Sequence, residues 1–420
     1  MKHLLLTIAA IVCSVSQLYA DGAQVRLSDS SCRLFEQGET ITISADVTVE
    51  QPERLNLTYV VRDDVGNELE RRTRRVKVTS SVEGVAPLRV KGLDAGFYSV
   101  ELLCEGEKVD FHKFGIDPDA VVSLPDGEAD FDEFWAAARR ELDAVEPCYT
   151  LTECEERSTS RRRFYYVEMQ SLGGEKISGY YLEPVAEGKF PALICYLGYG
   201  SDQWIPDADA TAERVEFYLS HRGQGLNKPT NKYGDWIVSG MESEHTYYYK
   251  GAYMDAVRAI DFVASRDKVN ADLIFAEGGS QGGALTLAAC ALDDRIAAAA
   301  PFVPFMSDFP DYMNMAVWPA NALKPAAEQR GIAYEEMLRV LSYFDIKNLA
   351  PNIKCPILMG FGLQDEVCPP HTNFAGYNNL AVPKRWVVFP KRGHDVHNES
   401  EWYRLREEFF AEIIHKYNNQ

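Results

Sequence analysis

A serine between glycines lies at residues 278–282, where the sequence reads G-G-S-Q-G. The apolar residues 273–276 before it are typical of a strand, and the small residues 284–289 after it are typical of a helix. A sharp strand-to-helix turn can present a serine hydroxyl to a histidine and to backbone amides, which makes the hydroxyl a nucleophile. The pattern therefore predicts acyl transfer by Ser280, although a glycine-rich loop without catalytic function can have the same sequence.

A carboxylate and a histidine follow the serine in the order Ser, acid, His. Residues 355–362 predict a buried strand with Asp365 in the loop after it, and residues 386–390 predict a second strand followed by His394. Both loops would then lie at the carboxyl edge of one parallel sheet. We expect His394 to take the Ser280 proton and return it to the leaving group, while Asp365 fixes the tautomer and stabilises the imidazolium.

Three other residues could take the acid and histidine roles, namely Glu366, His371 and His397. We interpret them as solvated loop residues. Only His394 directly follows a strand-ending loop, as this arrangement requires.

An oxyanion hole needs two backbone amides, one after the nucleophile and one from the loop after an earlier strand. Gln281 supplies the first amide. Residues 190–196 predict a strand that leads into Leu197-Gly198-Tyr199, so the Tyr199 amide is the expected second donor. An ordinary turn at residues 198–200 is the alternative.

With these motifs the chain resembles the acetyl xylan esterase / cephalosporin-C deacetylase family, a carbohydrate esterase group of α/β-hydrolases. The likeness runs from residue 131 nearly to the C-terminus and includes residues 247–259, the G-S-Q-G-G run and the acid loop 365–370. The resemblance implies removal of acetyl groups from small acetylated sugars. The R-G-Q motif also implies a loop-organising role near the site for three residues, Arg222, Gly223 and Gln224.

Two positions depart from that family. Leu197 stands where the family commonly has histidine, and Asp395 stands where it has glutamate. Neither change removes a catalytic group, because the oxyanion donor is an amide and His394 is retained. The resemblance also implies a ring-like hexamer with active sites facing an inner chamber, an assembly that an added N-terminal domain could block.

The length of 420 residues predicts two domains after an N-terminal leader. Residues 1–20 have a basic start, an apolar run too short to span a membrane and a small residue at Ala20, which together predict a signal peptide. Lipid attachment at Cys13 is disfavoured by the larger Val12 before it. We therefore predict export to the periplasm or the extracellular space, without membrane insertion.

The formal charge of -20 argues against binding to nucleic acid or to an anionic membrane. The short basic clusters at 71–75 and 161–163 are interpreted as solvated strand faces. No Cys/His group has zinc-site spacing and no glycine-rich phosphate loop is present, so we predict neither a metal nor a cofactor.

Residues 21–118 alternate apolar and polar residues at 41–49, 55–61 and 98–104, which predicts a small immunoglobulin-like sandwich. This region has no tryptophan, so packing or assembly is favoured over sugar binding. Residues 115–127 are the predicted linker. Residues 119–420 then predict an α/β-hydrolase fold, a mostly parallel sheet with helices on both faces that begins with a helix from Phe131.

The leading hypothesis is an exported, cofactor-free serine esterase that acts on acetylated xylo-oligosaccharides or similar small sugars. A serine peptidase of the prolyl-oligopeptidase type is one alternative, but its propeller cannot be built from so short an N-terminal region. A non-catalytic binding protein of the same fold is another. It has no physical need to keep Ser280, Asp365 and His394 together.

Overall fold

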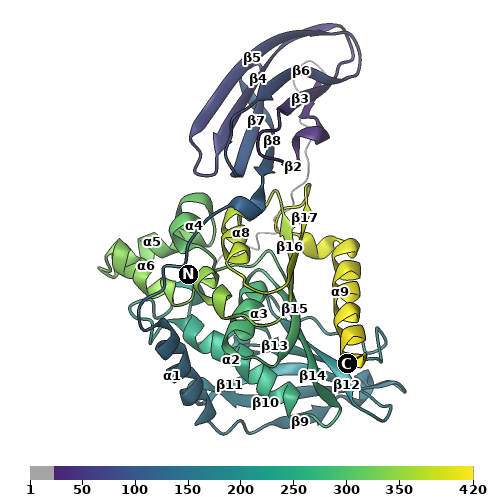
Figure 1. Ribbon diagram of the computed structural model, residues 1–420, viewed down its shortest axis with the longest axis vertical. Helices are drawn as coiled ribbons and strands as arrows, with labels where there is room; N and C mark the ends of the chain where they lie inside the picture. Colours follow the sequence, from purple (N-terminus) through teal and green to yellow (C-terminus); the bar gives the residue numbers. More distant parts are fainter. Residues whose placement is uncertain (1–22, 420) are drawn as a thin grey trace, which may run out of the picture. The chain divides into compact units, whose positions relative to one another are not determined.

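The computed structural model describes residues 23–419, which form two compact units (Figure 1). The first unit ends at Ile116 and the second begins at Asp117. The predicted signal peptide and Cys13 lie outside the described residues. Within residues 23–419, no helix combines the length and the apolar character needed to cross a membrane.

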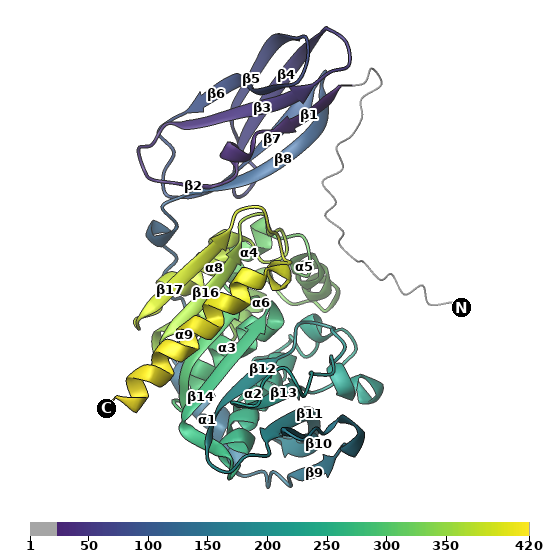
Figure 2. The ribbon, with the colours of Figure 1, turned by 90° about the vertical axis from the view of Figure 1, so that its right-hand side faces the viewer.

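The first unit is a sandwich of two sheets (Figure 2). The smaller sheet has the order β1-β3-β6, with bounds Gln24–Leu27, Ile41–Thr48 and Val82–Val90. The larger has the order β2-β8-β7-β4-β5, with bounds Leu34–Phe35, Glu107–Ile116, Gly96–Cys104, Glu53–Asp63 and Glu68–Val78. Neighbouring strands are antiparallel, except that β2 runs parallel to β8.

The alternation of apolar residues decides which side of each strand is buried. In β3 and β4 the apolar core residues recur at every second position and meet between the sheets, namely Ile41, Ile43, Ala45, Val47, Leu55, Leu57, Tyr59 and Val61 among others. Successive side chains of a strand point to opposite faces, so this period of two produces one apolar face per sheet. The predicted immunoglobulin-like sandwich is confirmed.

The second unit is built on a nine-stranded sheet with the order β17-β16-β15-β14-β12-β13-β11-β10-β9. The strands from β17 to β13 run parallel, and β11, β10 and β9 form an antiparallel edge. In chain order the bounds are Thr150–Glu153, Arg162–Ser171, Glu175–Pro184, Phe190–Tyr196, Val215–Ser220, Val269–Gly279, Ile296–Phe302, Ile357–Gly362 and Lys384–Phe389 for β9 to β17.

Helices cover both faces of this sheet. Figures 1 and 2 show α9 on one face, with α1, α2 and α3 on the other. The bounds are Phe131–Asp143, Tyr248–Ala264, Gln281–Leu292, Phe309–Met315, Ala320–Gln329, Tyr334–Ser342, Ile346–Leu349, Pro370–Asn378 and Ser400–Asn418 for α1 to α9. The predicted mostly parallel sheet between helices is confirmed.

The start of the second unit matches the helical pattern read from the sequence. All five apolar residues at that spacing are buried in α1, namely Phe131, Phe134, Trp135, Ala138 and Leu142. The predicted linker, however, begins too early. Gly115 and Ile116 still belong to β8 and pair with Phe97 and Gly96 of β7.

The basic cluster at residues 161–163 is not a solvated face throughout, which corrects the sequence interpretation. Arg161 and Arg163 are exposed, but Arg162 is fully buried in β10. Its Nη1 donates to Glu216 Oε2 at 2.8 Å, and Arg214 Nε donates to the other oxygen at 2.9 Å. A strand places neighbouring side chains on opposite faces, so one arginine of three enters the interior.

Removal of the Glu216 charge should destabilise the second unit. Glu216→Gln leaves Arg162 buried without a counter-charge, and we expect a loss of about 3 kcal/mol in the free energy of unfolding. Tryptophan fluorescence during urea unfolding measures this loss in the second unit, because all six tryptophans lie there. Glu153→Gln removes a partly exposed partner of Arg163 at 3.4 Å and should cost less than about 1 kcal/mol. Equal losses in the two variants would contradict the argument.

Candidate active site

Ser280 occupies the turn between a strand and a helix. β14 ends at Gly279 and α3 begins at Gln281, so Ser280 alone makes the turn. Its φ of 57° and ψ of -123° lie outside the usual regions for a residue with a side chain, a strain typical of functional turns. Its amide donates to Phe302 at 3.1 Å and its carbonyl accepts from Phe305 at 3.0 Å, so neighbouring backbone holds the turn in place.

The glycines of the motif permit a close approach of backbone segments. A Cβ atom on Gly282 would lie 2.2 Å from the carbonyl oxygen of Tyr196, at the end of β12. A Cβ atom on Gly278 would lie 2.4 Å from the carbonyl oxygen of Gly282. Both distances exclude a side chain, so α3 can start against the strand ends only with glycine at these positions.

Asp365 and His394 lie in the loops after β16 and β17, and they are in contact. His394 Nδ1 lies 2.8 Å from Asp365 Oδ2, and the Asp365 side chain is fully buried. An ionised carboxylate only accepts hydrogen bonds, so Nδ1 carries the proton and Nε2 is left to act as a base. Gly362 lets the two loops meet, because a Cβ atom there would lie 1.9 Å from the carbonyl oxygen of Gly393.

The charge of Asp365 is stabilised by the backbone. Its Oδ1 accepts hydrogen bonds from the amides of Val367 at 2.8 Å and Cys368 at 2.9 Å. Burial disfavours a charged imidazole at His394, but the carboxylate beside it outweighs burial and raises the pKa of His394 above its ordinary value of 6.5. The histidine is thus a stronger base than a free imidazole.

Cys368 connects the acid loop to the nucleophile. Its amide donates to Asp365, and its thiol lies close enough to the Ser280 side chain to interact with it. Burial raises the pKa of the Cys368 thiol, so it stays neutral. The structure therefore brings Ser280 next to the loop that carries Asp365, the partner of His394.

The three alternative candidates for the acid and histidine roles lie outside the contact between Asp365 and His394. Glu366 and His397 are exposed. His371 is not the solvated loop residue that we expected from the sequence. It lies in the first turn of α8, where its Nε2 is 3.5 Å from Asp311 Oδ2.

The two predicted oxyanion donors follow adjacent strands. Tyr199 lies after β12 and Gln281 after β14, and these strands pair in parallel. Gln281 Nε2 donates to the carbonyl of Leu197 at 3.3 Å, which joins the two segments. Within residues 23–419, neither the Tyr199 amide nor the Gln281 amide has an assigned acceptor, whereas the amide of Gly200 donates to Gln224 Oε1 at 2.8 Å.

Gln224 of the R-G-Q motif ties these two loops together. The residue is fully buried, and its Oε1 also accepts from Gln281 Nε2 at 3.2 Å. Its Nε2 donates to Gln281 Oε1 and to the Tyr248 hydroxyl, both at 3.1 Å. One side chain therefore contacts both the loop of Tyr199 and the residue after the nucleophile.

Arg222 anchors the start of the loop that carries the R-G-Q motif. Its Nη2 and Nε donate to the two oxygens of Asp255 in α2 at 2.7 and 2.8 Å, and its amide donates to Asp255 at 2.9 Å. Gly223 follows with φ of 68°, a left-handed conformation that glycine adopts without strain. Arg222 thus anchors the loop on α2 by a buried two-bond ion pair.

Sequence reasoning missed the side chains that surround Gln281. His221 is fully buried and its Nε2 lies 3.0 Å from Gln281 Nε2, while the Tyr249 hydroxyl donates to Gln281 Oε1 at 2.9 Å. Burial lowers the pKa of His221 to about 4, so the ring is neutral and accepts through Nε2. The available signals were the position of His221 directly before R-G-Q and that of Tyr249 within residues 247–259.

The strand order and the serine turn at the end of β14 define an α/β-hydrolase. The family model described as acetyl xylan esterase (AXE1) matches residues 123–408. The chain belongs to the acetyl xylan esterase family, and it is a carboxylic ester hydrolase.

Individual relatives agree with this assignment. The acetyl esterase Axe7A of Xylanibacter ruminicola is 24% identical over 428 residues, which cover 96% of each chain. The acetyl xylan esterase from Paenibacillus sp. R4 is 32% identical, with a TM-score of 0.65 over 70% of this chain and 98% of its own. Acetyl xylan esterase 1 from Thermoanaerobacterium sp. is 28% identical, with the same TM-score over 70% of this chain and 97% of its own.

The contact between Asp365 and His394 predicts the pH dependence of the reaction. The histidine must be neutral to accept a proton, so kcat/KM should fall as the pH decreases through a pKa above 6.5. In Asp365→Asn burial and the smaller effect of Asp395 remain, so the acid limb should move to lower pH while kcat falls about 10³- to 10⁴-fold. Rates of p-nitrophenyl acetate hydrolysis over a pH series measure both effects.

Glu366→Gln is the matched control, because it removes an exposed carboxylate from the same loop. Its pH profile should stay that of the unmodified enzyme. A larger effect at Glu366 than at Asp365 would show that the acid has been assigned to the wrong residue.

Proposed function

We propose that this chain is an exported serine esterase that removes acetyl groups from acetylated xylo-oligosaccharides or similar small sugars. The observation that carries the proposal is the 2.8 Å contact between His394 and the buried Asp365, beside a serine held at a strained turn. Export depends on the signal sequence in residues 1–20. The hexamer implied by the family resemblance stays a prediction.

In the first half-reaction the Ser280 hydroxyl attacks the acetyl carbonyl carbon, and its proton passes to Nε2 of His394. The oxygen that becomes negative is stabilised by the amides of Tyr199 and Gln281. The bond to the sugar oxygen then breaks, and His394 returns the proton to that oxygen. The deacetylated sugar leaves and the acetyl group stays on Ser280.

In the second half-reaction a water molecule attacks the acetyl-serine ester. His394 takes a proton from this water, and the same two amides stabilise the new negative charge. The bond to the serine oxygen breaks, His394 protonates Ser280, and acetate is released. Asp365 stays ionised throughout and stabilises the imidazolium that forms twice in the cycle.

Aromatic side chains beside the oxyanion loop favour a sugar substrate. Trp318 is 50% exposed, and its ring packs edge-on against Tyr199 with centroids 5.5 Å apart. Trp236 also packs edge-on against Tyr199, with ring centroids 5.3 Å apart. The apolar face of a pyranose ring stacks well on an exposed indole, so Trp318 can hold the sugar whose ester faces Ser280.

Neither alternative hydrolase-fold function gains support from the described residues. The first unit is a two-sheet sandwich and not the propeller that a peptidase of the prolyl-oligopeptidase type has in front of its hydrolase domain. A binding protein would not need the strained turn at Ser280 or the buried charge of Asp365. Both features cost free energy and fit catalysis.

Acetate release from acetylated xylo-oligosaccharides tests the proposal. We expect release by the mature protein and a decrease of about 10⁴-fold or more in Ser280→Ala, because the nucleophile is lost. Ser400→Ala at the exposed start of α9 serves as the control and should behave as the unmodified protein. Hydrolysis of p-nitrophenyl acetate without release from the sugar would discard the substrate, and inactivity on both would discard the esterase mechanism.

Substitution of Trp318 should affect binding of the sugar alone. We expect Trp318→Leu to raise KM for an acetylated xylo-oligosaccharide about 3- to 10-fold, which corresponds to an aromatic contact of about 0.7 to 1.4 kcal/mol. The KM for p-nitrophenyl acetate should not change. Val317→Ala, at a neighbouring residue that is 67% exposed, should leave both constants unchanged. An equal rise for both substrates in Trp318→Leu would indicate a distorted site.

A further inference from the structure

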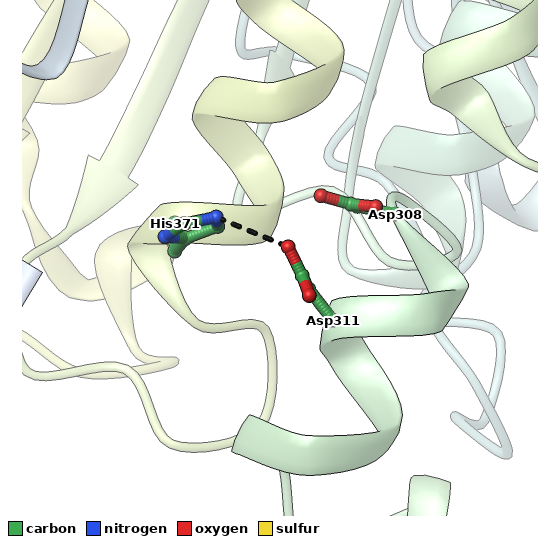
Figure 3. Close-up of side chains that lie close together, drawn as sticks. All are labelled: Asp308, Asp311 and His371. Atoms are coloured by element: carbon green, nitrogen blue, oxygen red, sulfur yellow. Dashed lines mark ion pairs between the residues drawn. The ribbon is translucent and has the colours of Figure 1, made fainter. Parts of the chain in front are cut away.

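Two aspartates and a histidine converge in the second unit, and none of the three has an assigned role in ester hydrolysis. Asp308 immediately precedes α4, Asp311 lies in the first turn of that helix, and His371 lies in the first turn of α8. One donor atom from each residue lies within 4.8 Å of the other two. Figure 3 shows Asp308 and Asp311 at the start of α4, opposite the His371 ring on α8.

Asp308 has an unsatisfied oxygen atom. The residue is 1% exposed, and its Oδ1 accepts a hydrogen bond from Lys347 Nζ at 3.1 Å. Its Oδ2 is buried, and no hydrogen-bond donor is assigned to it anywhere in residues 23–419. A buried carboxylate oxygen without a partner is costly, and a bound cation is one of the few groups that satisfies it.

The surrounding charges favour a cation. Lys347 is the buried base of this cluster, and its Nζ lies 3.1 Å from both Asp308 and Asp126. Asp311 adds a further carboxylate to the cluster. The cluster therefore has one ammonium group and three carboxylates. An ion with two positive charges would balance the remainder.

The donor set indicates the class of ion. Mg²⁺ and Ca²⁺ prefer oxygen donors alone, whereas one imidazole nitrogen with two carboxylates suits Zn²⁺ or Mn²⁺. The Asp311 side chain is 45% exposed and that of His371 is 18% exposed, so the site can be reached from solvent. Three protein ligands leave a fourth position for water.

We propose that Asp308, Asp311 and His371 bind one divalent transition-metal ion that links α4 to α8. The ion stabilises the segment that follows the acid loop, because α8 begins directly after residues 365–369. This inference is independent of the proposed substrate.

Calorimetric titration of the chelator-treated mature protein with ZnCl₂ and with MnCl₂ tests the proposal. We expect one saturable site for at least one of these ions and a higher melting temperature in its presence. In Asp308→Asn and in His371→Ala we expect at least a tenfold loss of affinity, with folding checked by circular dichroism. His245→Ala removes an exposed histidine that lies 3.4 Å from Glu244, and this control should bind as the unmodified protein does.

Absence of a saturable site for both ions would overturn the proposal. So would unchanged affinity in either folded variant, because both residues are proposed as ligands. Asp311→Asn, at a partly exposed position, replaces Asp308→Asn if the buried substitution prevents folding. Unchanged affinity in that variant would equally refute the site.

Discussion

The close approach of α3 to the end of β12 is the constraint on which the site depends. Gly282 faces the carbonyl of Tyr196 at a distance that excludes any side chain. This approach forces Ser280 into a strained turn and places Gln281 beside Leu197, where the oxyanion loop begins. The nucleophile and the two expected oxyanion donors are thus positioned by one contact between backbone segments.

Buried amide groups extend this constraint across the site. Gln281 and Gln224 bond to each other, and the former also reaches the neutral ring of His221 while the latter reaches the amide of Gly200. A buried polar network is rigid when its members find partners, because each broken bond leaves an unsatisfied group in a medium of low dielectric. Such rigidity maintains the distance between the amides that stabilise the developing charge.

Charge is buried in the second unit mainly where a partner is provided. Asp365 has two amides and His394, and Arg222 has both oxygens of Asp255. Asp308 has Lys347 as its charge partner, but its second carboxylate oxygen has no assigned donor among residues 23–419. The hydrogen bonds to Asp365 stabilise the negative charge that the reaction needs. The unsatisfied oxygen of Asp308 instead supports the proposed metal site.

The sequence by itself determined the features that depend on local order. It predicted the turn at Ser280, the strand-end positions of Asp365 and His394, the helix from Phe131 and the sandwich strands, because periodicity and turn chemistry are local. Only the tertiary structure decided which polar residues are buried and which distant residues meet, as for Arg162, His221, the side chain of Gln281, Cys368 and the cluster of Asp308, Asp311 and His371. These contacts join segments far apart in the chain, and their burial follows from the packing of whole elements.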